Sequence, residues 1–213
     1  MPPDCLILAF DTSAAHCAAA LLLGDTVLSV RVEPMHKGQA ERLFPLLEEV
    51  LAENNKNWSD LQAIGVCTGP GNFTGIRISV ASARGLALSL GIPAVGISKL
   101  EAMAYGTTGH VTAVLDARRE RVYRQSFDNA QALSAPQMSV LLDIYSQLEA
   151  EAVRMIEDEA LDLPNAQPVE SIVEAVAHLT AERYQQEHPR PAPLYLRAAD
   201  AALPRDPPIV ILP

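Results

Sequence analysis

The sequence lacks the spacings of cysteine and histidine by which disulfide frameworks and metal sites are usually recognised. Its three cysteines are odd in number and form no Cys-x-x-Cys pair, so neither a disulfide framework nor a zinc knuckle is indicated. We therefore predict that Cys5, Cys17 and Cys67 are small buried thiols. The five histidines never recur at the His-x-x-x-His or His-Glu-x-x-His spacing, so we predict no metal site built on two histidines.

Long apolar runs and an excess of basic charge are also missing. No run of about 18 apolar residues occurs, so no transmembrane helix is predicted. The first apolar run ends at Asp11 and follows no basic residues, unlike a signal peptide. These absences predict a cytoplasmic protein without membrane contact. The formal net charge of −10 opposes direct binding to a phosphate backbone, so any contact with nucleic acid is expected to be indirect, through a partner.

What the sequence does contain is an alternation of strand-like and helix-like segments in its first hundred residues. Apolar runs and periodicity predict the order β-β-β-α-β-α-β, in which Gly24 and Asp25 form a tight turn between the second and third strands. Pro45 is unfavourable inside a helix, so the first helix is expected to begin near Phe44 or to be kinked. The predicted strands are 5–11, 17–25, 26–33, 61–69 and 92–98, and the predicted helices are 39–55 and 76–90.

The second half of the chain repeats the opening pattern more weakly. Residues 111–127 again read as strand, aspartate, turn and strand, with Asp116 in the place of Asp11, which suggests an ancient duplication. We place a domain boundary between residues 99 and 109, giving a first lobe of 1–100 and a second, shortened lobe of 101–213 with a proline-rich C-terminal tail. Within the second lobe we predict a strand at 152–158, an amphipathic helix at 168–188, and an edge strand or extended arm at 193–197.

The segment GPGNFTGIR, which starts at Gly69, is laid out like a phosphate-binding loop but lacks its lysine. Gly75 is followed by Ile76, so the Walker pattern fails, and the glycine spacing does not fit a dinucleotide-binding fingerprint. Three interpretations remain: a turn whose helix is capped by Asn72 or Thr74, a weak anion site, or a contact with a partner. The helix that follows is rich in small residues and carries Arg77 and Arg84 on one stripe, which is typical either of an internal helix or of a close helix-to-helix contact.

The turn after the first strand is the other candidate site. In actin-like ATPases the corresponding turn holds phosphates, and Asp11, Thr12 and Ser13 have suitable side chains for that role. A turn that only joins two strands is the simpler interpretation. Residues 116–121 are similarly either a solvated turn or an RNA contact, and no Gly-x-Ser-x-Gly nucleophile motif occurs.

Four segments together resemble the bacterial TsaB family, the tRNA threonylcarbamoyladenosine biosynthesis proteins, also described as inactive glycoprotease-like or peptidase M22-like proteins. The segments are ILAFDTS near the start, GPGNFTGIRIS, LDARRERVY, and PLYLR near the end. The resemblance covers most of the chain but not residues 128–165. It implies an α/β actin-like ATPase (ribonuclease H-like) fold of two lobes, each with a mixed sheet that starts as an antiparallel meander and carries helices.

The resemblance also implies a function in tRNA processing. TsaB-like proteins serve as non-catalytic partners of TsaD, a metal enzyme that transfers threonylcarbamoyl to adenosine 37 of tRNA, and of the ATPase TsaE. By resemblance this chain has no catalytic residue, metal or cofactor of its own, and ATP or ADP would bind only at a heteromeric interface. It would form a homodimer when alone and would meet tRNA only indirectly. An alternative is an enzyme, either a peptidase or a small ATPase, that acts through Asp11, Thr12 and Asp116.

The resemblance places the partner interface on the glycine loop and on the helix that follows it. Three departures from the family pattern, Gln39, Asn72 and Ser79, concern this region or the first helix. The predicted interface residues are Gly69, Pro70, Gly71, Asn72, Phe73, Thr74, Gly75, Ile76, Arg77, Ser79, Val80, Ala83 and Arg84.

Overall fold

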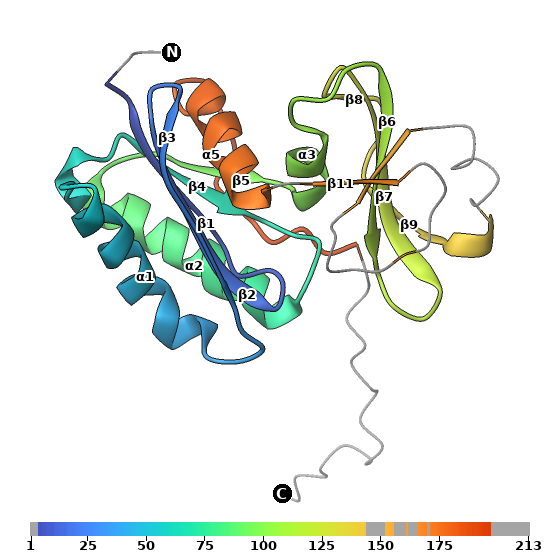
Figure 1. Ribbon diagram of the computed structural model, residues 1–213, viewed down its shortest axis with the longest axis horizontal. Coiled ribbons are helices and arrows are strands. Elements are labelled where there is room, and N and C mark those ends of the chain that lie inside the picture. Colours follow the sequence, from blue (N-terminus) through green and yellow to red (C-terminus); the bar gives the residue numbers. More distant parts are fainter. Residues whose placement is uncertain (1–3, 144–151, 156–160, 162–165, 170, 197–213) are drawn as a thin grey trace, which may run out of the picture.

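Two β-sheets stand next to each other in the computed structural model, which describes residues 4–143, 152–155, 161, 166–169 and 171–196 (Figure 1). The first sheet has the strand order β3-β2-β1-β4-β5. Its first three strands form an antiparallel meander, and β4 and β5 extend it in parallel. This confirms the predicted order of elements. The strands are β1 (Leu6–Asp11), β2 (His16–Leu23), β3 (Thr26–Pro34), β4 (Ala63–Cys67) and β5 (Ala94–Ile97).

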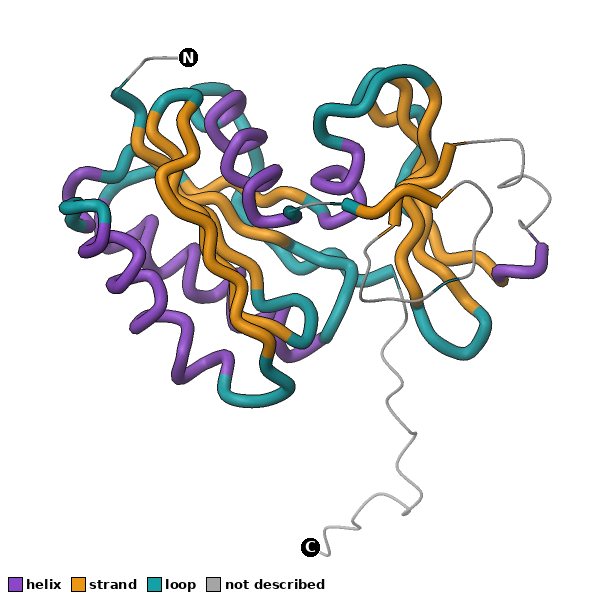
Figure 2. The backbone as a smooth tube through the Cα atoms, viewed as in Figure 1, coloured by secondary structure: helices purple, strands orange, loops and turns teal. Residues whose placement is uncertain are grey.

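Helices cover both faces of the first sheet, as the purple segments of Figure 2 make clear. Helices α1 (Gln39–Glu53) and α2 (Phe73–Leu90) pack on one face, and α5 (Ile172–Arg183) packs on the other. A sheet covered on both faces explains why β1 and β4 are buried throughout and why, apart from Asp11 at the end of β1, their residues do not alternate between apolar and polar.

The first helix begins at Gln39, as in the predicted range 39–55, and includes Pro45. The alternative start near Phe44 is therefore wrong. A proline inside a helix costs about 3 kcal/mol because it lacks an N–H donor. Burial of the stripe that the sequence did predict outweighs this cost, at roughly 1.5–3 kcal/mol for each large apolar side chain. The stripe consists of Leu43, Leu46, Leu47, Val50 and Leu51.

The second sheet repeats the topology of the first. Its order is β11-β10-β6-β7-β8, with β9 also paired to β7. The β6–β7 pair is antiparallel and β10 and β11 are parallel to β6, as β4 and β5 are to β1. Equivalent strands in an equivalent order support the predicted duplication. The strands are β6 (His110–Asp116), β7 (Arg121–Asp128), β8 (Gln131–Ala132), β9 (Gln137–Val140), β10 (Ala152–Met155) and β11 (Ala166–Pro168).

Two segments connect the sheets. Helix α3 (Lys99–Ala104) packs Leu100 and Met103 into the core of the second sheet, while its Ala102 belongs to the core beneath α5. Helix α5 lies in the second predicted lobe, yet it packs against the first sheet. The domain boundary near residue 100 stays a prediction.

The extended segment 189–196 forms no strand but returns to the first sheet. There Leu194 N donates to Thr68 O at 2.9 Å, so the predicted arm is observed. The rest of the predicted proline-rich tail, from Arg197 onward, lies outside the described residues, as do positions 156–158 of the predicted strand 152–158.

Candidate functional site

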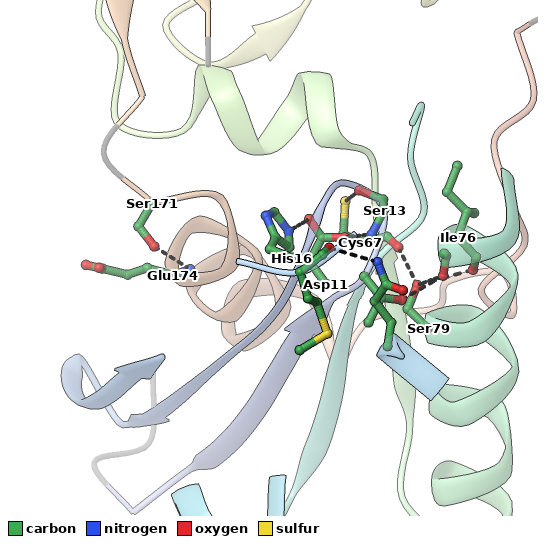
Figure 3. Close-up of polar contacts among 12 residues, drawn as sticks. Asp11, Ser13, His16, Cys67, Ile76, Ser79, Ser171 and Glu174 are labelled. Atoms are coloured by element: carbon green, nitrogen blue, oxygen red, sulfur yellow. Dashed lines mark hydrogen bonds and ion pairs between the residues drawn. The ribbon is translucent and has the colours of Figure 1, made fainter. Parts of the chain in front are cut away.

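Asp11 ends strand β1 and is fully buried beside the β1–β2 turn (Figure 3). One carboxylate oxygen accepts the Ser13 N–H at 2.6 Å, and the other lies 3.1 Å from His16 Nε2. Burial raises the pKa of this carboxyl, but the hydrogen bond and charge of His16, the charge of Lys99 and the Ser13 amide together leave the pKa well below its ordinary value. Asp11 is therefore an ionised residue with both oxygens occupied.

This arrangement suits a structural counter-ion better than a catalytic base or a metal ligand. A general base needs a pKa near the working pH, and a metal ligand needs a free oxygen in an open site. Among the described residues, no group of three or more His, Cys, Asp or Glu side chains could hold a metal ion. Thr12 and Ser13 are also fully buried, so the predicted phosphate turn presents no accessible hydroxyl.

The glycine loop packs directly against the β1–β2 turn. Asn72 N donates to Ser13 O at 2.6 Å, and the Thr12 hydroxyl donates to Gly75 O at 2.7 Å. A Cβ at Gly75 would lie 2.9 Å from the Thr12 carbonyl carbon and closer still to its oxygen. A Cβ at Gly71 would lie 3.2 Å from the Ser13 carbonyl carbon. These glycines thus allow the loop to approach the chain's own turn, which corrects our attribution of them to a partner helix.

The start of α2 confirms one of the interpretations left open by the sequence. The Asn72 side chain accepts the Gly75 N–H at 2.9 Å and caps the helix. Ser79, one of the departures from the family pattern, is fully buried, and its hydroxyl lies within 3.3 Å of Cys67 O (Figure 3). Ser79 therefore joins α2 to strand β4.

Burial divides the predicted interface residues into two groups. Seven of them face the chain's own core and cannot contact a partner as the fold stands: Gly69, Pro70, Gly75, Ile76, Ser79, Val80 and Ala83. This corrects the prediction for these seven residues. Five of them lie in α2, where the helix period places them on the side that packs on the sheet, and Gly69 and Pro70 lie in the loop before the helix. The exposed members are Gly71, Asn72, Phe73, Thr74, Arg77 and Arg84.

The exposed side of α2 also includes residues that our sequence reasoning missed. Leu88 is 86% exposed, and a Cβ at Gly85 would meet no atom within 4 Å. The helical spacing of the exposed positions could have identified them. We call this surface the outer face of α2 and define it by Phe73, Arg77, Ala81, Arg84, Gly85 and Leu88, all exposed.

Tyr195 extends the outer face from the C-terminal arm. Its ring centroid lies 5.0 Å from that of Phe73, and its hydroxyl accepts a hydrogen bond from Arg77 Nε at 2.8 Å. The Arg77 guanidinium also lies 3.7 Å from the centre of the Phe73 ring. The sequence contains the PLYLR segment, but nothing in it indicates that Tyr195 meets the start of α2.

The β6–β7 turn repeats the geometry of the β1–β2 turn. Arg118 N donates to an Asp116 carboxylate oxygen at 2.7 Å, as Ser13 N does to Asp11. Arg118, Arg119 and Glu120 have φ values of 62°, 54° and 59°, and all three are exposed. The structure thus supports the predicted equivalence of Asp116 and Asp11, and it places residues 118–120 in an exposed turn.

Comparisons with known proteins agree with this geometry. The protein-family model of TsaD, tRNA N6-adenosine threonylcarbamoyltransferase, matches residues 33–137. The tRNA threonylcarbamoyladenosine biosynthesis protein TsaB of Bacillus subtilis is 38% identical over 120 residues, which are 55% of this chain and 52% of that protein. Escherichia coli TsaB is 34% identical over 122 residues, again 55% and 52% of the two chains. An uncharacterised Mycobacterium tuberculosis protein, Rv3421c, is 33% identical over 199 residues, 92% of this chain and 93% of that one.

The chain belongs to the TsaB family. It spans about half the length of the curated TsaB proteins it matches. The solved structure of YeaZ from Pseudomonas aeruginosa superposes with a TM-score of 0.72 at 24% identity, and the match covers 90% of this chain and all of that one. The fold is therefore the two-sheet, actin-like ATPase type that the sequence predicts for a TsaB-like protein.

The TsaB-like chain has no helix, within the residues that the structure describes, long and apolar enough to cross a membrane. All three cysteines are free and buried, which confirms that prediction. Burial, together with the charge of Asp11, raises the pKa of the Cys67 thiol to about 12. Burial and the charge of Glu33 raise that of Cys17 to about 11. Both thiols are therefore protonated at neutral pH and unsuited to nucleophilic chemistry.

Proposed function

We propose that this chain is a non-catalytic subunit of the system that forms threonylcarbamoyladenosine at position 37 of tRNA. It binds a TsaD-like metal enzyme and a TsaE-like ATPase, and it contacts tRNA only through them. It has no cofactor of its own. Its TsaB relatives carry the name of this biosynthesis, and its site chemistry is consistent with a partner that performs no step itself.

The observation that carries this proposal is the closure of the β1–β2 turn. In an actin-like ATPase the turn must leave room for phosphates, with backbone amides and hydroxyls exposed to them. Here the glycine loop lies directly against the turn: Asn72 N donates to Ser13 O at 2.6 Å, and the Thr12 hydroxyl donates to Gly75 O. The Ser13 amide donates to Asp11. The Thr12 hydroxyl and the Ser13 amide are thus already used within the protein, which supports a turn that binds no nucleotide.

The same contacts weigh against an enzyme that acts through Asp11. Its carboxylate is buried and ionised, and both of its oxygens already have polar partners. The neighbouring Cys67 thiol is protonated. Neither group offers the half-ionised, accessible atom that a peptidase or an ATPase would use. We do not retain that alternative as a second candidate.

The outer face of α2 supports the partner-binding half of the proposal. It combines small residues at its centre, Ala81 and Gly85, with an exposed leucine and two arginines, and no acidic residue occurs between Asp60 and Glu101. Small residues allow close approach of another helix, and exposed aromatic and arginine side chains are typical of the residues that dominate binding energy at interfaces.

Reconstitution tests the proposal. The full chain, the TsaD- and TsaE-like proteins of its source organism, an activated threonylcarbamoyl donor and unmodified tRNA are combined, and the modified nucleoside is measured by mass spectrometry. We expect modification to require the chain at stoichiometric amounts and to be unaffected by Asp11→Asn in a folded preparation. Modification at the same rate without the chain would contradict the proposal.

A further inference from the structure

The Arg77 side chain is held in one orientation before any partner binds. Its guanidinium lies over the Phe73 ring at 3.7 Å, and its Nε donates to the Tyr195 hydroxyl at 2.8 Å. The two aromatic rings in turn contact one another at 5.0 Å. An exposed arginine normally samples many rotamers, and fixing one on binding costs about 0.5–1.5 kcal/mol. Here Phe73 and Tyr195 fix it beforehand.

The part of the guanidinium that usually binds carboxylates stays available. The Tyr195 hydroxyl accepts a hydrogen bond from Nε alone. Within the part of the chain that the structure describes, no acceptor contacts the terminal amino groups Nη1 and Nη2 of Arg77. Arg77 is exposed, so these donors face solvent. A planar guanidinium presents paired N–H groups that match the two oxygens of a carboxylate.

Tyr195 is kept in place by the packing of the arm that carries it. Leu194 N donates to Thr68 O at 2.9 Å, and Pro191 packs on Gly96, where a Cβ would lie 3.2 Å from Pro191 Cα. The arm thus crosses the ends of β4 and β5 and delivers Tyr195 to the first turn of α2. Segments 118 residues apart in the sequence build one binding element.

We infer that Arg77, oriented by Tyr195 and Phe73, is the anchor on the outer face of α2 for a carboxylate side chain carried by an apolar helix of the protein partner. This inference rests on the proposed function and adds the chemistry of the partner's contact surface. Tyr195 acts as a positioning residue, since it contacts Arg77 and sets the direction of its free donors.

Charge and composition favour a protein carboxylate over the other possible occupants. The chain's net charge of −10 repels nucleic acid phosphates. The outer face contains two arginines and no carboxylate, so a second copy placed face to face on the same patch would bring like charges together. The surroundings of Arg77 are apolar, with Phe73 45% and Tyr195 44% exposed, and such a setting suits a buried helix contact.

The test measures the dissociation constant of the full chain for the purified TsaD-like protein of its source organism. Arg77→Lys keeps the charge but loses the paired donors, and we expect about 10- to 100-fold weaker binding. Tyr195→Phe keeps the ring and removes the acceptor of the Arg77 Nε–H, and we expect a loss of roughly 3- to 10-fold. Arg119→Lys is the matched control, because Arg119 is exposed on the β6–β7 turn and lies outside the outer face of α2, and its dissociation constant should stay within about 2-fold of wild type.

Two further readouts separate positioning from stability. Thermal unfolding of the three variants should match the wild type within about 2 °C, because all three sites are exposed. In Arg77→Gln the dependence of the dissociation constant on salt concentration should flatten, and Tyr195→Phe should add little to the loss already caused by Arg77→Gln. Independent, additive losses would contradict a positioning role for Tyr195.

The outcomes are distinguishable from those of the proposed function. If the wild-type chain does not bind the TsaD-like protein, the proposed function fails and this inference fails with it. If wild type, Arg77→Lys and Tyr195→Phe bind equally well, only the inference is overturned. It is also overturned if Arg77→Lys weakens binding of tRNA or self-association while binding of the TsaD-like protein is unchanged.

Discussion

At the scale of single residues, the buried Asp11 carboxylate is held by groups of its own chain. Its partners are the Ser13 amide and His16, with the charge of Lys99 nearby, and no ligand is needed to complete them. Removing one partner of a buried charge typically lowers stability by about 3–5 kcal/mol, so Asp11 stabilises the fold only while all of its partners are present.

The depressed pKa of Asp11 predicts how stability depends on pH. Since the folded pKa lies below the ordinary value of 3.8, ionised Asp11 contributes stability above about pH 4 that is lost as the pH falls further. We expect Asp11→Asn to lower the free energy of unfolding by about 3 kcal/mol at pH 7, with a smaller difference from wild type at pH 3. Urea denaturation at both pH values measures this. If Asp11→Asn lowers the free energy of unfolding by the same amount at pH 3 as at pH 7, the carboxylate charge is not what stabilises the turn.

The cysteines give a second prediction at this scale. Cys5, Cys17 and Cys67 are all buried, and burial raises the pKa of the latter two thiols. A thiol reagent such as Ellman's should therefore react with none of them in the native protein within minutes at pH 8, and with all three in denaturant. Fast labelling of a single native thiol, located by peptide mass spectrometry, would contradict the burial of that residue.

At the scale of elements, the glycines of α2 separate an internal contact from an open surface. Gly75 has the Thr12 backbone against it, whereas Gly85 has nothing within 4 Å. Replacing glycine by alanine should therefore change the stability of the protein in opposite directions at these two positions. Gly75→Ala should destabilise the protein by more than about 2 kcal/mol, since backbone must move, and Gly85→Ala should stabilise it by about 0.5–1 kcal/mol through helix propensity. Equilibrium unfolding of both variants measures this; equal effects would mean that the loop does not pack on the turn.

The strands and helices themselves could largely be predicted from periodicity. The buried stripe from Leu43 to Leu51 and the opening meander follow from local patterns, and so does the capping role of Asn72. The sequence could not indicate why Gly71 and Gly75 are glycines, because the atoms that they meet belong to the β1–β2 turn, some sixty positions away. It likewise left open whether α1 begins before Pro45, because tertiary burial, which overrides the local cost of the proline, cannot be read from the local pattern.

At the scale of the whole molecule, two sheets of the same topology are joined, and the segment that follows α5 returns to the first sheet. Helix α5 covers the face of the first sheet opposite α1 and α2, and the arm that follows places Tyr195 beside Arg77. The candidate site is thus composed of segments 118 residues apart in the sequence. Local patterns identified its glycine loop, but only the folded molecule identifies which side of α2 is free.

The most direct measurement of the central claim is a calorimetric titration of the full chain with the purified TsaD-like protein of its source organism. Leu88, 86% exposed on the outer face of α2, is replaced by arginine, and Leu133, 55% exposed near the second sheet, is replaced in the same way as the control. We predict tight binding by wild type and Leu133→Arg, and at least about 10-fold weaker binding by Leu88→Arg, because the bulk and charge are forced into a close helix contact. Equal binding by all three proteins, or no binding by the wild type, would contradict the account.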